Sequence, residues 1–473
     1  MLGLFFLEHL LGLANFNPNI LFILSETMLI QSISGVRGLT ASHLTPEIAI
    51  QYARALHQML PDGVIMAGRD SRPSGEEIIH AMMGELIRLG RTVIQCGIVP
   101  TPTVQYMVHN TEAVGGFIVT ASHNPIEWNG IKFVREDSTF FHEKDCERLF
   151  ELAVAENEVS DAEEVGIIWP EQNAIQKHVI ACVSLKCIDL NRIQRRHFKI
   201  VIDAVNGAGA HALPTLLEAL GCEVIELNCE PDGNFTRGTE PLPENLTDLS
   251  KSVLENGADA GFAVDPDADR LAVVNEKGKP IGEEYTLVLA ADGYLNEVDE
   301  TEVFVTNLST SQSLDKLAES KGSSVIRSEV GEINVVNKMN QVGSKLGGEG
   351  NGGVILREAH LGRDSLVGAI MVLNRISQSN ETLSNIHQSL PQFEIVKDKI
   401  SLESIDSDEL IEKVSSLFND AEKNMLDGVK FTWDDRWVHL RMSNTEPIMR
   451  IYAEGRNKQD AQKLIDNVRF CIK

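Results

Sequence analysis

Three aspartates on alternate residues form a dense group of negative charge in the sequence. Asp265, Asp267 and Asp269 stand in AGFAVDPDADRLAVVNE, between two apolar runs that we expect to be strands. Crowded carboxylates repel one another, and a hard divalent cation with oxygen ligands relieves that repulsion. Mg²⁺ typically keeps a few carboxylates and leaves room for a phosphate oxygen. The spacing therefore predicts a Mg²⁺ site in this loop.

Two other chemistries fit parts of the same loop. Glu276 falls at the twelfth position of a calcium EF-hand, but Arg270 occupies the sixth, where glycine makes the turn, and strands replace the flanking helices. In an aspartyl-phosphate phosphatase Asp265 would be the nucleophile. That class expects Thr or Val two residues beyond the second aspartate, and this chain has Asp269 there. Both alternatives fit less of the loop than Mg²⁺ does.

A serine follows an apolar run in a turn of small and polar residues. Ser122 lies in TASHNPIEWNGIKF, directly after GGFIVTA, and Pro125 ends the turn. We expect such a turn to present Ser122 rather than bury it. His123 and Lys132 are near enough in sequence to serve it with a proton or a positive charge. A turn serine that bonds its own backbone is the alternative.

Two loops nearer the C-terminus could bind a phosphate and a sugar. RMSNTEPIMR offers a guanidinium fork, hydroxyls, an amide and turn N–H groups, all of which suit phosphate oxygens: Arg441, Ser443, Asn444 and Thr445. The loop GGEGNGG, residues 347–353, carries Glu349 and Asn351 among glycines, and its carboxylate and amide suit sugar hydroxyls. Strand-connecting turns and glycine-rich loops are also common as purely structural features.

The elements that position these loops follow one local pattern three times. In residues 64–90, 199–221 and 302–320 a β-branched run enters a polar turn and a helix-period stretch follows. This repetition predicts α/β domains with mixed or mainly parallel sheets, whose ligands lie at the carboxyl ends of the strands. Residues 437–442, 448–454 and 458–471 read as strand, strand and helix of a small α+β unit.

Composition narrows the class of protein. With 473 residues, of which 43% are hydrophobic and 23% charged, the chain is long enough for three or four globular domains. A formal net charge of -27 argues against nucleic acid and anionic membranes as partners. The seven cysteines include no CxxC pair, which favours a reducing cytoplasm over a disulfide framework or a zinc site.

Residues 1–27 are apolar, yet no Lys or Arg precedes the apolar part as in a secretory signal. Polar residues and Pro18 interrupt the segment before the roughly 20 apolar residues that a membrane span needs. We expect Met28 to be the true start and residues 1–27 to be a non-native leader. A disordered or peripheral extension is the alternative.

Taken together and in this order, the four loops resemble the α-D-phosphohexomutase superfamily, and SGVRG (34–38) and GRDSR (68–72) match it as well. The resemblance covers about residues 29–455. It implies an α/β fold of four domains around one central cleft, with three related mixed-sheet α/β domains and a smaller C-terminal α+β domain. After the leader 1–27, the expected domains are 28–165 with a phosphoserine loop, 166–275 with the metal loop, 276–390 with the sugar-binding loop and 391–473 with the phosphate-binding loop.

The resemblance also implies roles for single residues. The implied catalytic set is Ser122, Arg37, His123, Lys132 and Arg270. The implied substrate-binding set is Glu349, Asn351, Arg441, Ser443, Asn444 and Thr445. The implied ligands of Mg²⁺ are phosphorylated Ser122, Asp265, Asp267 and Asp269.

The implied reaction moves a phosphoryl group between the ends of a hexose phosphate, with a hexose 1,6-bisphosphate as primer and intermediate. LIQSISGVRG, PLPENL and the sugar and phosphate loops resemble the archaeal-type phosphoglucosamine mutases, which implies glucosamine 6-phosphate as substrate. A phosphomannomutase/phosphoglucomutase is the main alternative, followed by an aspartyl-phosphate phosphatase or a non-catalytic sugar-phosphate binder. We expect a small-molecule partner only, and a monomer or homodimer.

The chain departs from the superfamily pattern at two positions. Bacterial mannose- and glucose-type mutases usually carry a histidine at the end of the sugar loop, where this chain has Gly353. The proton-transfer role would then fall to His360 or Arg363, or rest on Arg37 and Lys132 alone. Pro266 replaces a common glycine in the metal loop, which stiffens the turn without removing a ligand.

Overall fold

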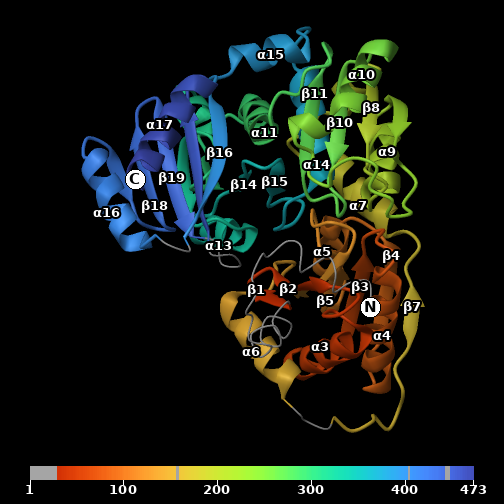
Figure 1. The fold of residues 1–473 in the computed structure, drawn as a ribbon. Coiled ribbons are helices and arrows are strands. Elements are labelled where there is room, and N and C mark those ends of the chain that lie inside the picture. The colour runs from red at the N-terminus through yellow and green to blue at the C-terminus, as the bar shows by residue number, and fades with distance from the viewer. Residues whose placement is uncertain (1–28, 156–158, 403–404, 443–447, 473) are drawn as a thin grey trace, which may run out of the picture.

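The computed structural model describes residues 29–155, 159–402, 405–442 and 448–472 (Figure 1). The predicted leader and three residues of the predicted phosphate loop, Ser443, Asn444 and Thr445, lie outside the described residues. Within the described ranges, none of the helices has both the length and the apolar character that a membrane crossing requires.

The N-terminal sheet has seven strands in the order β1-β2-β6-β5-β3-β4-β7. Its strands are β1 (Ile30–Ser32), β2 (Gly35–Leu39), β3 (Val64–Arg69), β4 (Val93–Ile98), β5 (Ala113–Val119), β6 (Trp128–Arg135) and β7 (Ile168–Pro170). Successive residues of β3 point to opposite faces of the sheet. On one face Ile65 packs in a core with the helices α3 (Pro46–Met59), α4 (Gly75–Arg88) and α6 (Glu143–Val154). On the other face Met66 packs in a core with α5 (Thr101–His109).

The second and third sheets have four strands each, in the orders β11-β10-β8-β9 and β15-β14-β12-β13. Their strands are β8 (Lys199–Asp203), β9 (Glu223–Leu227), β10 (Ala260–Val264), β11 (Leu271–Asn275), β12 (Val303–Asn307), β13 (Ser324–Ser328), β14 (Leu346–Glu349) and β15 (Gly353–Leu356). Their helices are α7 (Ala174–Val183), α8 (Leu190–Gln194), α9 (Gly209–Ala219), α10 (Thr247–Asn256), α11 (Glu284–Glu297), α12 (Ser313–Ser320), α13 (Glu332–Val342), α14 (Ser365–Ser377) and α15 (Leu383–Ser389).

One continuous apolar core joins these two sheets. It contains Phe262 of β10, Phe304 of β12 and almost the whole length of α11 and α14, which pack against each other. Figure 1 shows α14 beside the strands of the second sheet, with β14 and β15 nearer the centre of the molecule. A helix apolar on all sides must be covered all round, and two neighbouring sheets provide that cover.

The C-terminal sheet is antiparallel throughout, in the order β16-β20-β19-β18-β17. Its elements are β16 (Glu394–Ser401), α16 (Ser407–Leu417), β17 (Glu422–Asn424), β18 (Val429–Trp433), β19 (Arg436–Met442), β20 (Ile448–Gly455) and α17 (Lys458–Phe470). This unit has its own apolar core and lies to one side in Figure 1. The fold predicted from sequence, three related mixed-sheet α/β domains and a smaller α+β domain, is confirmed.

The three predicted strand-turn-helix units begin with β3, β8 and β12, and each of these strands has parallel neighbours on both sides. In every case the next strand of the sheet turns back through an antiparallel hairpin: β5–β6, β10–β11 and β14–β15. The Ser122 turn, the aspartate loop and the sugar loop are the connections of these three hairpins. The three sequence motifs therefore occupy one topological position in three related domains.

Candidate active site

The aspartate loop, which is the predicted metal loop, is a tight, fully buried turn between β10 and β11. Asp265, Asp267 and Asp269 are each 0% exposed, and one oxygen from each lies within 4.8 Å of the others. Asp265 Oδ1 accepts hydrogen bonds from the backbone N–H groups of Asp269 and Arg270, both at 3.2 Å. Ala268 takes a φ of 52°, which lets alternate carboxylates face the same side of the turn.

The donor set fits a divalent cation. Asp267 Oδ1 and Asp269 Oδ1 are buried without a hydrogen-bond partner among the described residues, a state that costs free energy unless something compensates it. Burial, and then the two neighbouring carboxylates, raises the pKa of Asp265 well above its usual range. A hard cation with oxygen ligands would satisfy both orphaned oxygens and allow all three groups to ionise.

Ser122 faces this loop, and the expectation that it is presented rather than buried is wrong. Its side chain is only 2% exposed, because the metal loop of the second domain covers the turn of the first. Ser122 Oγ donates to Asp265 Oδ2 at 3.1 Å and lies 3.3 Å from His123 Nδ1. The serine also adopts a φ of 50°, a conformation that is uncommon outside glycine and recurs at functional turns.

Arg72, which sequence analysis did not single out, holds the serine turn in place. Its side chain is fully buried and pairs with Asp70 Oδ2 at 3.0 Å. Its Nη atoms donate to four backbone carbonyls of the turn, those of Ser122, Asn124, Pro125 and Trp128, at 2.6–3.1 Å. Because a guanidinium carries its donors in a rigid fork, one side chain fixes the path of the whole turn. GRDSR contained this signal, but a local motif does not reveal which loop its arginine reaches.

Three cations predicted from sequence meet the carboxylates and the serine. Lys132 Nζ, on β6, lies 2.6 Å from Asp267 Oδ2 and 3.6 Å from Asp269 Oδ2. Burial by itself would lower the pKa of Lys132, but the charges of Asp267 and Asp269 outweigh burial and raise this pKa above its usual value, so the ammonium stays charged. Arg270 donates to His123 Nδ1 at 3.2 Å, and Arg37 donates to Asn124 Oδ1 at 2.9 Å.

His123 is a neutral acceptor in this arrangement. Burial, followed by the charges of Arg270 and Arg37, lowers its pKa to about 2. Since Nδ1 accepts from Arg270, the remaining ring proton lies on Nε2.

Thr101 was also not predicted from sequence. It donates its hydroxyl to Asp267 Oδ2 at 2.8 Å and so ties α5, the first helix after β4, to the metal loop.

In the sugar loop Glu349 ends β14, and Asn351 lies in the turn that leads to β15. Glu349 Oε1 accepts from Asn307 at 2.7 Å and from the N–H of Gly331 at 3.1 Å. Its Oε2 accepts from Arg363 at 2.9 Å, and Arg363 in turn reaches Asp269 Oδ2 at 2.6 Å. The sugar loop is thus joined to the metal loop by a single side chain.

Arg441 of the predicted phosphate loop is placed on β19, where its Nε lies 2.8 Å from Asp427 Oδ2. Asp427 also accepts from the backbone N–H of Val330 at 3.0 Å, so the C-terminal domain touches the segment that binds Glu349 through Gly331. None of the contacts of the described residues joins Arg441 to Ser122 or to the aspartates.

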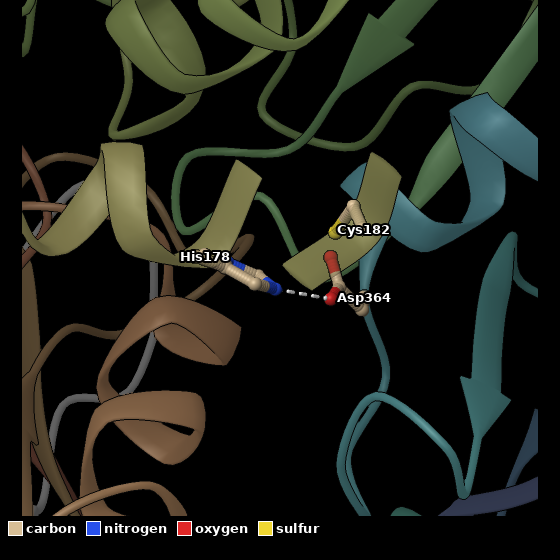
Figure 2. A group of neighbouring side chains, drawn as sticks. All are labelled: His178, Cys182 and Asp364. Carbon is tan, nitrogen blue, oxygen red and sulfur yellow. Dashed lines mark hydrogen bonds and ion pairs between the residues drawn. The ribbon is translucent and has the colours of Figure 1, made fainter. Parts of the chain in front are cut away.

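Both residues considered as replacements for the sugar-loop histidine are buried and paired with carboxylates. His360 is 2% exposed, and its Nε2 pairs with Asp364 Oδ2 at 3.1 Å. Asp364 also binds His178 Nε2 at 2.8 Å, and Figure 2 shows this pair beside the Cys182 thiol. Burial disfavours the charged form of Arg363, but Asp269, Glu349 and Glu332 outweigh burial and raise the pKa of its guanidinium well above its usual range.

His178, His360 and Asp364 form a hydrogen-bonded joint, and the Cys182 thiol lies beside it. Asp364 Oδ1 already accepts from the N–H groups of Leu366 and Val367, and Oδ2 faces both histidines. Burial raises the pKa of the Cys182 thiol well above its usual range, which keeps it protonated. Thr103 of α5 contacts the other nitrogen of His178, so the joint links the first domain to helices α7 and α14.

Related α/β domains that bring a serine, a carboxylate triad and buried cations together define an enzyme of phosphoryl transfer. Profiles described as phosphoglucomutase/phosphomannomutase alpha/beta/alpha domains I, II and III match residues 29–159, 176–278 and 282–393, and the C-terminal domain profile matches residues 397–469. The chain belongs to the phosphoglucomutase/phosphomannomutase family, whose members are isomerases that move a phosphoryl group within a sugar phosphate.

Individual relatives agree over nearly their whole length. A phosphoglucomutase/phosphomannomutase of Thermococcus kodakarensis is 35% identical over 91% of this chain and 96% of its own. A probable phosphoglucosamine mutase of Methanopyrus kandleri is 33% identical over 93% and 97%. The crystal structure of a family protein from Burkholderia thailandensis superposes with a TM-score of 0.82 at 27% identity, covering 94% of this chain and 98% of that one.

The hydrogen bonds of Arg72 to the Ser122 turn lead to the first prediction. Arg72→Met leaves four backbone carbonyls of the turn without their donor and the buried Asp70 carboxylate without its partner. We expect the free energy of unfolding of the N-terminal domain to fall by about 3–5 kcal/mol and turnover to fall with it. Urea unfolding followed by circular dichroism measures the first effect. Arg148→Met, which removes an exposed i,i+3 pair with Glu151, is the matched control and should change stability by less than about 0.5 kcal/mol.

Proposed function

We propose that this protein is a phosphoglucosamine mutase, which interconverts glucosamine 6-phosphate and glucosamine 1-phosphate through a phosphorylated Ser122. The observation that carries the mutase chemistry is the 3.1 Å contact between Ser122 Oγ and Asp265 Oδ2 in a buried site that also holds Lys132 and Arg270. An ordinary turn serine has no reason to face a buried carboxylate triad of another domain.

In the proposed reaction, phospho-Ser122 gives its phosphoryl group to the free hydroxyl of the sugar monophosphate. The bond from phosphorus to Ser122 Oγ breaks as the bond to the sugar oxygen forms, and the resulting 1,6-bisphosphate turns over and returns its other phosphoryl group to the serine. The protein's task is to hold the reactants in line and to meet the charge on the phosphoryl oxygens. Lys132 and Arg270 supply positive charge at the aspartates that Ser122 faces.

Asp265, Asp267 and Asp269 would hold Mg²⁺ together with an oxygen of the phosphoserine. When bound, the ion neutralises charge on the phosphoryl group and lowers the barrier to transfer. In the first transfer a proton leaves the sugar hydroxyl and Ser122 Oγ gains one. In the return transfer Ser122 Oγ gives up its proton and the departing sugar oxygen gains one. Arg37 and Lys132 are the two residues predicted for proton transfer and charge stabilisation, and Arg37 contacts the serine turn through Asn124 Oδ1 at 2.9 Å.

The first test of this function is the covalent state of the serine. After incubation with glucosamine 1,6-bisphosphate, intact-protein mass spectrometry should show one added phosphate on the wild-type chain and none on Ser122→Ala. Turnover of the variant should fall by at least about 1000-fold, because the group that carries the phosphoryl is gone. Ser138→Ala, a change at another buried serine, serves as control. Retention of both the added mass and full turnover by Ser122→Ala would exclude the mechanism.

The metal role is tested by removing one charge at a time. Asp265→Asn, Asp267→Asn and Asp269→Asn should each lower kcat by about 100-fold or more, since an amide is a poorer Mg²⁺ ligand. Calorimetric titration should show weaker Mg²⁺ binding in each variant. Chelation of the wild type should mimic the loss, and added Mg²⁺ should reverse it. Undiminished turnover in EDTA would rule out this role for the triad.

Two observations support glucosamine as the sugar. Several similar proteins are named as probable phosphoglucosamine mutases. Beside Glu349 lies a second buried carboxylate, Glu332, whose Oε2 accepts from Arg363 at 3.0 Å and whose Oε1 has no hydrogen-bond partner among the described residues. Burial raises the pKa of Glu332 to about 7. A 2-ammonium group would donate to the free oxygen and favour the ionised carboxylate.

Substrate choice should therefore respond to Glu332. In Glu332→Gln we expect kcat/KM for glucosamine 6-phosphate to fall by about 10- to 100-fold, the value of one charged hydrogen bond, and kcat/KM for glucose 6-phosphate to change much less. A ³¹P NMR panel with glucosamine, glucose and mannose 6-phosphates, each primed with its 1,6-bisphosphate, makes the measurement. A wild-type preference for mannose or glucose phosphate would instead favour a phosphomannomutase/phosphoglucomutase, the name of the Thermococcus relative.

A further inference from the structure

Arg363 lies at the point where three segments of the chain approach one another. It belongs to the connection between β15 and α14, and only 8% of the residue is exposed. Its three nitrogens pair with three carboxylates: Nη2 with Asp269 at 2.6 Å, Nη1 with Glu349 at 2.9 Å and Nε with Glu332 at 3.0 Å. One guanidinium thus contacts the metal loop, the sugar loop and the first turn of α13.

The base of this side chain is anchored to the same two loops. The N–H of Asp364 donates to the carbonyl of Val354 on β15 at 2.9 Å, and Ser365 Oγ donates to the carbonyl of Ala268 in the metal loop at 2.6 Å. The Asp364 carboxylate caps α14 and is itself held by His178 and His360, the first of which appears in Figure 2. Backbone and guanidinium are therefore both fixed.

Gly353 leaves the room that the stem of Arg363 occupies. A Cβ atom at position 353 would lie 2.3 Å from Cδ and 2.8 Å from Cγ of Arg363, far inside contact distance. The backbone of Gly353 does not need a positive φ, in contrast to Gly352, whose φ is +87°. Position 353 is thus a glycine because of its neighbour's side chain, since its own conformation is open to any residue.

We infer that Arg363 is a positioning residue that sets Asp269 for the metal ion and Glu349 for the sugar at the same time, and that Gly353 is required because it admits the Arg363 stem. The inference rests on the proposed mutase function. A fork with three occupied nitrogens fixes the distance and orientation between two carboxylates in a way that a lysine ammonium does not. Loss of the fork leaves Asp269, Glu349 and Glu332 close together without their shared cation.

A double-mutant cycle between positions 353 and 363 tests this inference. Arg363→Ala should lower kcat/KM by about 100-fold or more and Gly353→Ala by about tenfold, while the double variant should match Arg363→Ala within about twofold. The added methyl then no longer meets the Arg363 stem, and its remaining close neighbour, Asn351 Oδ1 at 3.1 Å, is a milder contact. Arg363→Lys should stay well below wild type. Gly84→Ala, at a helix position with open space around it, is the control and should leave the rate unchanged.

Two readouts separate positioning from a general structural effect. Calorimetric Mg²⁺ titration of the phosphate-free protein should show weaker binding in both Arg363→Lys and Gly353→Ala, which keep the positive charge beside Asp269, and added guanidinium should partly restore turnover of Arg363→Ala. Thermal melting identifies a variant that is not folded; if Arg363→Ala is one, Arg363→Lys and Gly353→Ala carry the test through their Mg²⁺ affinities. Additive losses in the double variant, or unchanged Mg²⁺ affinity in the singles, would overturn the inference.

The same measurements distinguish a failure of this inference from a failure of the proposed function. A wild-type chain without mutase activity on any hexose phosphate would refute the proposed function. Mg²⁺ affinities that still fall in both single variants would leave the coupling of Arg363 to Asp269 in place. Full mutase activity with unchanged Mg²⁺ affinities would refute the inference alone.

Discussion

The site is organised around the mutual repulsion of three aspartates buried within 4.8 Å of one another. Three negative charges in a low-dielectric interior are stable only with cations at contact distance. Lys132 comes from the first domain, Arg270 from the metal loop itself and Arg363 from the third domain. The charge balance of the metal loop therefore requires all three domains. The ion pairs that neutralise the aspartates also hold these domains together.

The repeated topology explains how distant segments reach this point. The serine, metal and sugar loops each connect the antiparallel hairpin that follows a central parallel strand, so each lies at the carboxyl end of its sheet. Domains II and III share one core, which fixes the metal and sugar loops relative to each other. Domain I reaches them through polar contacts, from Thr101 to Asp267 and from Ser71 to the carbonyl of Asn206.

The C-terminal domain is also joined through polar contacts. Its apolar core is separate, and it meets the third domain through buried polar pairs: Lys430 with the carbonyl of Leu308, Ser309 with His439 and the N–H of Gln312 with Glu454. Polar pairs of this kind exchange more readily than a shared apolar core. In the proposed reaction the C-terminal domain accepts a sugar phosphate in two orientations, which such a joint suits, while the shared core fixes the metal and sugar loops.

The sequence by itself determined the local structure: the three strand-turn-helix units, the hairpin of the C-terminal domain and the loops that carry Ser122, Asp265 and Glu349. Hydrophobic period and turn residues decide such elements within a few positions along the chain. It did not determine that Ser122 is buried, that Arg72 clamps its turn, or that Arg363 fills the space over Gly353. Those facts depend on which segment packs against each side chain: the metal loop of another domain covers Ser122, whereas Arg72 and Arg363 reach loops of their own domains that the tertiary fold brings to them.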